Sequence, residues 1–303
     1  MVKQKQKLLI IGGSGLLGST LTEYALSDYD IHITYNKNLP QNTDVKSVRV
    51  DLLNERTKII NLIASLKPNV VVHTAAHPSV DLCETDHHTA DLLHVDITKD
   101  IADVCRKINS KLFYISTDAV FGGEFGKKYT EEDLPNPINY YGKTKLAAEK
   151  IVLNDLDNVI LRTSVVYGWH NRSRFTSWIL GNLREKKPVD PFSDQYNTPT
   201  LVDDLAKSIL EIIRLRISGL YHAAGKTCLN RYEFAVEMAD RFGYDKNLIK
   251  PVTAAQKKQD APRPTYTCLD SGKLERLTNY QFCDTKRGIA LIYEKSCFNK
   301  SYI

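Results

Sequence analysis

A glycine-rich turn near the start of the chain constrains the fold more than any other feature. Residues 12–18 read Gly-Gly-Ser-Gly-Leu-Leu-Gly and directly follow the apolar run 8–11. Glycines at this spacing allow a tight turn, close approach of a pyrophosphate and close packing of the next helix, whose free N–H groups bind phosphates. The turn predicts dinucleotide binding, with a purely structural turn as the alternative. The expected contacts are Gly12, Ser14, Gly15, Leu16, Leu17 and Gly18.

Short β-branched runs alternate with longer amphipathic segments through the first half of the chain. We expect strands at 8–11, 31–35, 70–73, 112–116 and 159–162, and helices at 15–26, 57–66, 89–107 and 141–153. Strict alternation is typical of a parallel sheet with helices on both faces, and it explains why the strands are continuously apolar. The predicted fold class is therefore α/β, with a Rossmann-type doubly wound parallel sheet.

The pattern after residue 164 is less regular, with prolines between shorter elements and helices expected near 176–184, 202–214 and 231–242. We divide the chain into a dinucleotide-binding unit, 1–164, and a smaller C-terminal α/β substrate unit, 165–303, whose segments can interleave with the first. Residues 284–303 have weak periodicity, which assigns them no role. Open α/β sheets bind ligands at the carboxyl edge of their strands, so we expect the site between the two units.

Charge and hydropathy exclude several classes of function. The 41 basic and 36 acidic residues give a net charge of +5 and are spread along the chain, so no nucleic-acid partner is indicated. The apolar runs are too short to cross a bilayer. The basic N-terminus leads into the glycine turn rather than into the apolar segment of a signal peptide.

Cysteine and histidine spacing points to a cytoplasmic protein without a metal site. The six cysteines are far apart and form no CxxC pair, which favours free thiols. Five of the eight histidines fall within residues 73–94, but their spacing fits no HExxH or paired-ligand pattern. Of these, His77 is the one expected near the cofactor.

The end of the second expected strand indicates which dinucleotide binds. An NAD site usually has an acidic residue there, bonded to the ribose 2′-hydroxyl, whereas this chain has Asn36 and Lys37. Lys37 would attract a 2′-phosphate, so we expect NADPH, with NADH as the alternative and a solvated loop lysine as the other interpretation. Further residues expected along the cofactor are Asp51, Leu52, Ala75, Ala76 and His77.

Tyr141 and Lys145 are four residues apart at the start of an expected helix, which makes them neighbours on one face. An ammonium near a phenol lowers the phenol pKa from about 10, which suits a general acid for carbonyl reduction. The fourth expected strand ends at Ser116-Thr117-Asp118, where a hydroxyl would hold a carbonyl oxygen beside Tyr141. The glycine turn, this strand-end hydroxyl and the pair of Tyr141 and Lys145 are jointly far more specific than any one of them.

With these motifs in place, the chain resembles an extended short-chain dehydrogenase/reductase. Within that superfamily it is similar to the dTDP-4-dehydrorhamnose reductase family, which also contains the regulatory β subunit of methionine adenosyltransferase. The resemblance covers about residues 7 to 275, and the second-half segments distinguish this family from general nucleotide-sugar epimerases. It rests on the segments STDAVF (116–121), YGKTK (141–145), RTSVVYG (162–168), DQYNTPT (194–200), DLA (204–206), GLYH (219–222), RP (263–264) and LD (269–270).

The resemblance implies reduction of the 4-keto group of a nucleotide-linked 6-deoxy sugar, with hydride from the nicotinamide. It implies that Thr117 bonds the keto oxygen, that Tyr141 donates the proton and that Lys145 bonds the nicotinamide ribose. Arg263 would meet the nucleotide diphosphate, with an exposed loop arginine as the alternative. The residues expected at the substrate are Val80, Asp81, Asp118, Val165 and Arg263.

Three departures from the family pattern bear on the substrate. The family commonly has an aromatic residue where this chain has Ala119, a tryptophan at Val165 and an Asn-Ser pair at 265–267. Loss of two aromatic side chains predicts a wider or reshaped sugar pocket. A regulatory cofactor-binding subunit and a nucleotide-sugar epimerase stay open as alternatives, whereas Ala119 in place of a glutamate argues against a 4,6-dehydratase. The sequence is compatible with oligomerisation and favours no particular state.

Overall fold

The first strand is buried on both faces, and this determines the layers of the fold. The structure is a computed structural model that describes residues 5–42, 44–77 and 79–298. In strand β1 (Gln6–Ile11), Leu8 and Ile10 belong to one apolar core, whereas Leu9 and Ile11 belong to another. Since successive side chains of a strand point to opposite faces, helices must cover both sides of the sheet.

Seven parallel strands form the main sheet, in the order β10-β6-β5-β4-β1-β2-β3. The chain runs from β1 outward to β3 and then returns to β4 on the other side of β1. This reversal is where open α/β sheets bind their ligands. The predicted α/β class with a Rossmann-type doubly wound sheet is confirmed. Besides β1, the strands are β2 (Tyr29–Tyr35), β3 (Lys46–Arg49), β4 (Val70–His73), β5 (Lys111–Thr117), β6 (Val159–Thr163) and β10 (Gly219–His222).

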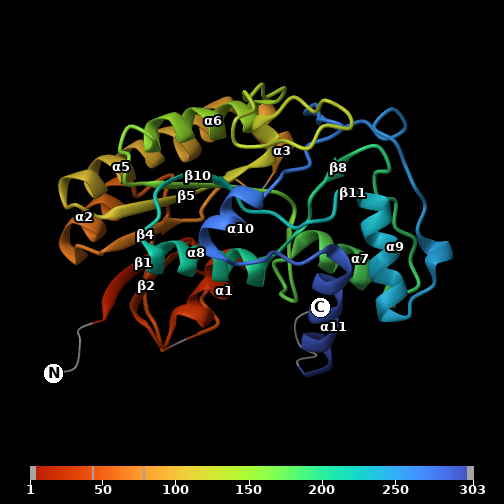
Figure 1. Ribbon diagram of the computed structural model, residues 1–303, viewed down its shortest axis with the longest axis horizontal. Helices are drawn as coiled ribbons and strands as arrows, with labels where there is room; N and C mark the ends of the chain where they lie inside the picture. Colours follow the sequence, from red (N-terminus) through yellow and green to blue (C-terminus); the bar gives the residue numbers. More distant parts are fainter. Residues whose placement is uncertain (1–4, 43, 78, 299–303) are drawn as a thin grey trace.

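Helices cover both faces of the sheet. On the face of Leu8 and Ile10 lie α1 (Leu16–Ala25) and α8 (Val202–Leu215). The opposite face is covered by α2 (Arg56–Leu66), α5 (Ile97–Lys107) and α6 (Tyr140–Val152). Figure 1 shows these two layers on opposite sides of the strands. The helices expected to start at 15, 57 and 141 begin within one residue of those positions.

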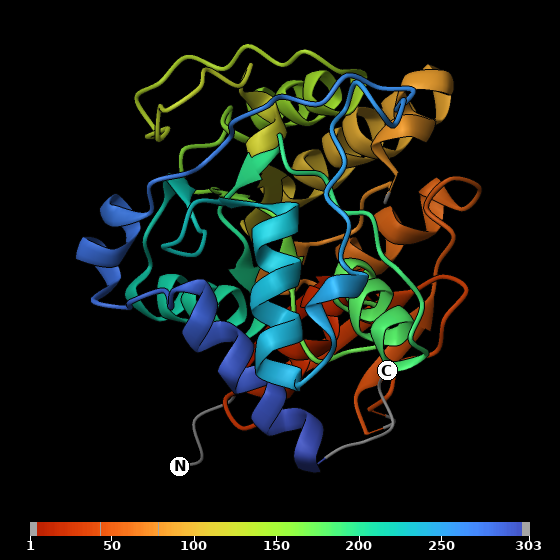
Figure 2. The same cartoon turned by 90° about the vertical axis from the view of Figure 1, so that its right-hand side faces the viewer.

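A further apolar core lies beside the sheet. It is formed by α7 (Arg174–Arg184), α9 (Arg231–Phe242) and α11 (Thr285–Phe298) and includes Ile179, Phe234 and Ile289. Helices α9 and α11 lie side by side in it (Figure 2). Helix α11 therefore covers most of residues 284–303, the segment to which the sequence assigns no role. Residues 299–303 of that segment lie outside the described residues.

Short elements complete the fold. Strand β7 (Val166–Tyr167) pairs with β9 (Thr200–Leu201), and β8 (Tyr196–Asn197) pairs with β11 (Leu229–Asn230). Within the described ranges, no helix is long and apolar enough to cross a membrane. The remaining helical elements are α3 (Val80–Thr85), α4 (His87–Asp91), η1 (Leu92–Asp96), η2 (Asp118–Val120), η3 (Lys246–Leu248) and α10 (Gly272–Thr278).

Two elements from the second half of the chain belong to the sheet layer. Helix α8 packs on one face of the sheet, and β10 pairs with β6 at its edge. Segments on either side of residue 164 are therefore interleaved in space. The division into units 1–164 and 165–303 stays a prediction, and residues 1–4 and 299–303 of those units lie outside the described residues.

The helix expected over 89–107 is interrupted. A five-residue π-helical turn, η1, joins α4 to α5, and such turns are frequent at functional sites. The turn contains His94, whose Nε2 accepts a hydrogen bond from the backbone N–H of His77 at 2.9 Å. Its Nδ1 lies 2.8 Å from the Thr144 hydroxyl. The interruption thus fixes the loop that follows β4.

The prediction that all six cysteines are free thiols is wrong for two of them. Cys228 and Cys268 form a disulfide, with Cα atoms 5.6 Å apart, a separation typical of such bonds. These residues are 40 positions apart in the sequence, and only the folding of the chain after residue 164 brings them together. Spacing alone carries no signal for this pair. The free cysteines are Cys83, Cys105, Cys283 and Cys297.

A buried ion pair joins α6 to β6. The guanidinium of Arg162 donates from Nε to Glu149 Oε1 at 3.0 Å and from Nη2 to Oε2 at 2.7 Å. Both side chains are almost completely buried. The hydroxyl of Ser116, on β5, donates to the same carboxylate at 2.5 Å.

We expect Arg162→Leu to lower the free energy of unfolding by about 3–5 kcal/mol, because it leaves the Glu149 carboxylate buried without its cation. Urea denaturation measures this change. The matched control is Arg214→Leu, which removes an exposed ion pair with Glu211 and should change stability little. Equal losses in the two variants would contradict the importance of the buried pair.

Candidate active site

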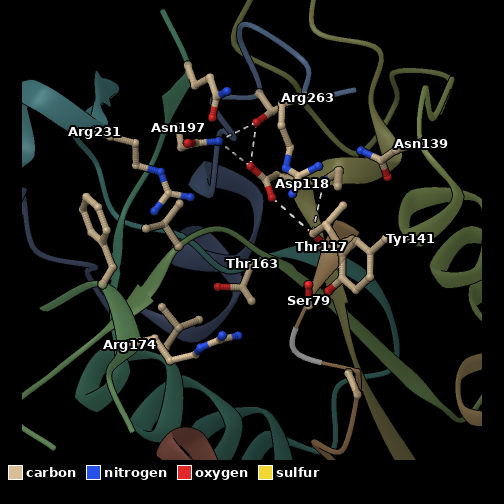
Figure 3. A pocket seen from close by; sticks show the side chains of 18 of the residues that line it. Ser79, Thr117, Asp118, Asn139, Tyr141, Thr163, Arg174, Asn197, Arg231 and Arg263 are labelled. Carbon is tan, nitrogen blue, oxygen red and sulfur yellow. Dashed lines mark hydrogen bonds between the residues drawn. The ribbon is translucent and has the colours of Figure 1, made fainter. Parts of the chain in front are cut away.

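A cavity of about 810 Å³ opens at the carboxyl edge of the sheet. One wall comes from α3, α6 and the ends of β4, β5 and β6, and the other from α7, the start of α9 and the segments 190–197 and 257–267. Figure 3 shows side chains from both walls pointing into this space. The predicted site residues that line it are Leu16, Leu17, Ala76, His77, Val80, Asp81, Thr117, Asp118, Tyr141, Lys145, Val165 and Arg263.

The glycine turn packs against the end of β4. Gly12 has a φ of +86°, in the left-handed region that favours glycine, and a Cβ there would lie 2.7 Å from Thr74 Oγ1. A Cβ on Gly18 would overlap the carbonyl oxygen of Gly12. The turn therefore forms a narrow backbone cradle at the N-terminus of α1. Leu16 and Leu17 extend from this cradle to the cavity.

Several predicted cofactor residues lie beside the cavity rather than in its walls. Gly12, Ser14, Gly15 and Gly18 belong to the turn and the first turn of α1, and Ala75 follows β4.

The end of β2 carries Asn36 and Lys37. Asn36 Oδ1 is buried and has no hydrogen-bond partner among the described residues, and Lys37 is exposed. Lys37 is therefore accessible to a ligand at this edge of the sheet.

Asp51 and Leu52 follow β3. The Asp51 carboxylate accepts hydrogen bonds from the backbone N–H of Leu53 and from the Asn54 side chain, both at 3.1 Å, so it stabilises its own turn. Leu52 is buried in the apolar core. The structure thus gives both residues a structural contact in addition to their predicted place along the cofactor.

The start of α6 brings Tyr141 next to Thr117. Asn139 caps the helix, since its Oδ1 accepts a hydrogen bond from the N–H of Gly142 at 2.8 Å. Thr117 ends β5, and its side chain lies beside the Tyr141 phenol. Figure 3 shows the two side chains together on one side of the cavity.

Burial raises the pKa of Tyr141, and the neighbouring Thr117 hydroxyl lowers it by less. The phenol is therefore protonated at neutral pH, which is the state that a proton donor requires. The expectation that Lys145 lowers this pKa is wrong. Lys145 Nζ donates instead to the carbonyl oxygen of Ile115 at 2.6 Å and lies 4.0 Å above the ring of Tyr114, because α6 packs on β5 and directs the amine to that strand.

Two opposing effects determine the pKa of the buried Lys145 amine. Burial lowers its pKa to about 7, and attraction to the Glu149 carboxylate opposes the shift. Glu149 is itself held by Arg162. The amine therefore changes its charge close to neutral pH, which makes it sensitive to any group that binds beside it.

Asp118 connects the two walls of the cavity. Its Oδ2 accepts hydrogen bonds from Ser164 Oγ at 2.7 Å, Asn197 Nδ2 at 2.9 Å and Thr267 Oγ1 at 2.6 Å. Its Oδ1 accepts one from Thr117 Oγ1 at 3.2 Å. Figure 3 marks the bonds that Asn197 and Thr117 make with Asp118. A carboxylate has about four acceptor positions. Side chains of the protein itself therefore use the acceptor positions of Asp118, which is expected from the sequence to lie at the substrate.

Asp81 and Arg263 form an ion pair at the mouth of the cavity. Arg263 Nη2 lies 2.9 Å from Asp81 Oδ2, and Asp81 Oδ1 accepts the N–H of Ala261 at 3.0 Å. The pair joins α3, which also supplies Val80, to the segment 257–267. Asp81 thereby neutralises most of the positive charge of Arg263, the residue that is expected from the sequence to bind a diphosphate.

Val165 has a φ of +43°, a conformation that β-branched residues rarely adopt and that is concentrated at functional sites. Its carbonyl accepts the N–H of Thr200 at 3.2 Å, which holds the strained position. Ala119 and Val165, the two positions where the family has aromatic residues, both line the cavity. The second wall supplies aromatic side chains of its own, namely Phe175, Trp178 and Phe192.

Sequence reasoning missed several residues of the second wall. Asn197 lies within the segment 194–200 on which the resemblance rests, so that motif was the available signal. Arg231 follows the N-cap Asn230 and reads in the sequence as an ordinary first residue of a helix. Only the packing of distant segments brings these residues to the cavity. The others missed in this wall include Arg174, Phe175, Trp178, Phe192 and Thr267.

Comparisons with known proteins agree with this arrangement. A family model described as RmlD substrate binding domain matches residues 6–297. The dTDP-4-dehydrorhamnose reductase of Aggregatibacter actinomycetemcomitans is 28% identical, over 93% of this chain and 97% of that protein. Methionine adenosyltransferase 2 subunit beta of Mus musculus is 32% identical, over 94% of this chain and 86% of that protein. A solved structure of dTDP-4-dehydrorhamnose reductase from Bacillus anthracis in complex with NADP is 27% identical, with a TM-score of 0.86 over 96% of this chain and 100% of that chain.

The fold, the cavity and these matches place the chain in the class of proteins that the sequence predicts. This class comprises the NAD(P)-dependent oxidoreductases of the extended short-chain dehydrogenase/reductase type. Within this class, the chain belongs to the RmlD substrate binding domain family, whose model spans nearly its whole length. The predicted resemblance to the dTDP-4-dehydrorhamnose reductases and to the methionine adenosyltransferase β subunit is confirmed.

The buried amine of Lys145 predicts a pH dependence of stability. Its folded-state pKa of about 7 lies below the ordinary value of 10.5, so between these values the unfolded chain binds more protons and stability rises with pH. We expect the free energy of unfolding of the wild type, relative to Lys145→Met, to increase from pH 7 to pH 9 in urea denaturation. Lys143→Met, at an exposed position of the same helix, should show no such change. A difference between wild type and Lys145→Met that is independent of pH would contradict the depressed pKa.

Proposed function

We propose that the chain is an NADPH-dependent reductase that converts the 4-keto group of a nucleotide-linked 6-deoxy sugar to an alcohol. The observation that carries the proposal is the convergence of Thr117, Tyr141 and Lys145 on one cavity beside the glycine turn. The relatives named dTDP-4-dehydrorhamnose reductase support this class of sugar. The proposal keeps the cytoplasmic location that the sequence predicts.

Two side chains would act on the keto oxygen. The Thr117 hydroxyl, which donates to Asp118 in the structure, would turn its proton to the keto oxygen. The Tyr141 phenol would donate its own proton to the same oxygen as hydride reaches carbon 4. The raised pKa of Tyr141 keeps the proton on the phenol until negative charge develops on the substrate oxygen. Lys145 would bond the ribose of the cofactor, the role that the family resemblance implies.

The residues beside the cavity fit a nicotinamide dinucleotide. A Cβ at Gly12 would fill the backbone cradle, and the N–H groups at the start of α1 suit phosphate oxygens. When bound, the cofactor supplies the hydride. The end of β2 has Asn36 and Lys37 and no acidic residue, which favours NADPH over NADH. The Bacillus anthracis relative in complex with NADP supports the same cofactor.

A second candidate function is a cofactor-binding regulatory subunit, because the methionine adenosyltransferase β subunits are relatives of similar identity. Such a subunit needs a partner enzyme but no reacting ketone. Capture of a synthetase partner together with a lack of NADPH turnover would favour it. The pairing of a protonated Tyr141 with Thr117 in an open cavity favours the reductase.

Tyr141→Phe is expected to lower kcat at least about 100-fold and to leave the Kd for NADPH nearly unchanged, because only the proton donor is removed. The loss of NADPH absorbance with a dTDP-4-keto-6-deoxy sugar measures kcat, and fluorescence titration measures Kd.

The neighbouring residue offers a matched control. The Tyr140 phenol donates to Asp91 at 2.7 Å and stacks on His87, and it does not line the cavity. Tyr140→Phe should therefore keep most of the wild-type kcat. Turnover by Tyr141→Phe close to that of Tyr140→Phe would remove Tyr141 from its role as the acid.

A further inference from the structure

The cationic side chains around the cavity differ in their partners. Lys257 lies 2.6 Å from Asp190, and Arg263 lies 2.9 Å from Asp81, so each has a carboxylate to balance its charge. Arg231 differs from both. In the part of the chain that the structure describes, no carboxylate forms an ion pair with it, and its guanidinium stacks on the ring of Phe175 at 4.8 Å.

The position of Arg231 is fixed by the start of α9. Asn230 and Glu233 form a reciprocal capping box, in which Glu233 N–H donates to Asn230 at 2.8 Å and Asn230 N–H donates to Glu233 at 3.0 Å. From there the guanidinium points into the cavity, from the side opposite Tyr141 (Figure 3). Stacking occupies a face of the planar group and leaves its N–H edge directed to the cavity.

The nearby carboxylate of Asp118 attracts Arg231 without pairing with it. The oxygens of Asp118 already accept hydrogen bonds from hydroxyl and amide groups on both walls. Burial lowers the pKa of Arg231 only to about 10, so the guanidinium is charged at neutral pH. A partly buried cation with unused donors is costly unless an anion binds to it.

We propose that Arg231 binds the diphosphate of the nucleotide-sugar substrate. This inference rests on the proposed function and refines it, since the sequence assigns that contact to Arg263. Arg263 is already paired with Asp81, whereas Arg231 offers the planar N–H edge that suits two phosphate oxygens at once. The sugar would then extend from Arg231 across the cavity to Tyr141.

The cofactor also carries a pyrophosphate, so the two sources must be separated. The backbone cradle for a cofactor pyrophosphate is the glycine turn before α1. Arg231 lies on α9, in the other wall of the cavity. A loss of affinity that affects the nucleoside diphosphate and spares NADPH is therefore the signature of the substrate site.

The experiment is calorimetric titration of the NADPH-loaded protein with dTDP and with UDP, and with thymidine and uridine as the forms without phosphate. Arg231→Met should weaken the binding of the nucleoside diphosphate about 10- to 100-fold, the loss expected for hydrogen bonds to a charged group. Nucleoside binding and the Kd for NADPH should not change. Arg231→Lys keeps the charge but loses the planar edge. Its affinity for the nucleoside diphosphates should therefore lie between those of the wild type and Arg231→Met.

Arg241→Met is the matched control. Arg241 lies on the same helix and stacks on Tyr293 at 4.8 Å, but it is exposed and does not line the cavity. It should bind the nucleoside diphosphates as the wild type does. Wild-type affinity in Arg231→Met overturns the inference, as does an equal loss in both variants or a loss of NADPH affinity instead.

The outcomes also separate this inference from the proposed function. If the wild type binds dTDP or UDP through Arg231 but reduces no keto sugar, the inference stands and the proposed reductase fails. If the wild type binds neither nucleoside diphosphate, the inference is overturned. If it reduces a keto sugar while Arg231→Met keeps full affinity, only the assignment of Arg231 fails.

Discussion

The hydrogen bonds to the Asp118 carboxylate hold the two walls of the cavity together, and the site depends on them. Ser164 reaches this carboxylate from the end of β6, Asn197 from β8 and Thr267 from the segment after Arg263. The disulfide from Cys268 to Cys228 adds a covalent link between the residue next to Thr267 and the start of β11. Because a buried carboxylate without donors is costly, the network favours one relative position of the walls and so sets the distance across the cavity.

Most of the first wall could be predicted, because its determinants are local. The spacing of Gly12, Gly15 and Gly18 after an apolar strand specifies the turn and the sheet, and the strict alternation of elements specifies parallel strands. Since strands end at a common edge, Thr117 and Tyr141 could be expected to meet. The direction of the Lys145 amine could not, because it depends on how α6 packs on β5 rather than on the four-residue spacing.

The second wall could be predicted only in part. The resemblance singles out the segment 194–200 and Arg263, but it gives no indication that Asp81 neutralises Arg263. Arg231 carries no local pattern, and its role emerges from Phe175, which is 56 positions away in the sequence and stacks on it. Long-range pairings of this kind, like the disulfide between Cys228 and Cys268, depend on tertiary packing that periodicity does not encode.

The central claim is that hydride reaches carbon 4 of a keto sugar while Tyr141 supplies the proton. It is tested most directly by incubating the protein with NADPH deuterated at the transferred position and a dTDP-4-keto-6-deoxy sugar, followed by mass spectrometry and NMR of the sugar. We predict an alcohol that carries one deuterium at carbon 4, with an equal amount of NADP⁺ formed. Recovery of the unchanged keto sugar while NADPH is bound, or a product without deuterium at carbon 4, would contradict it.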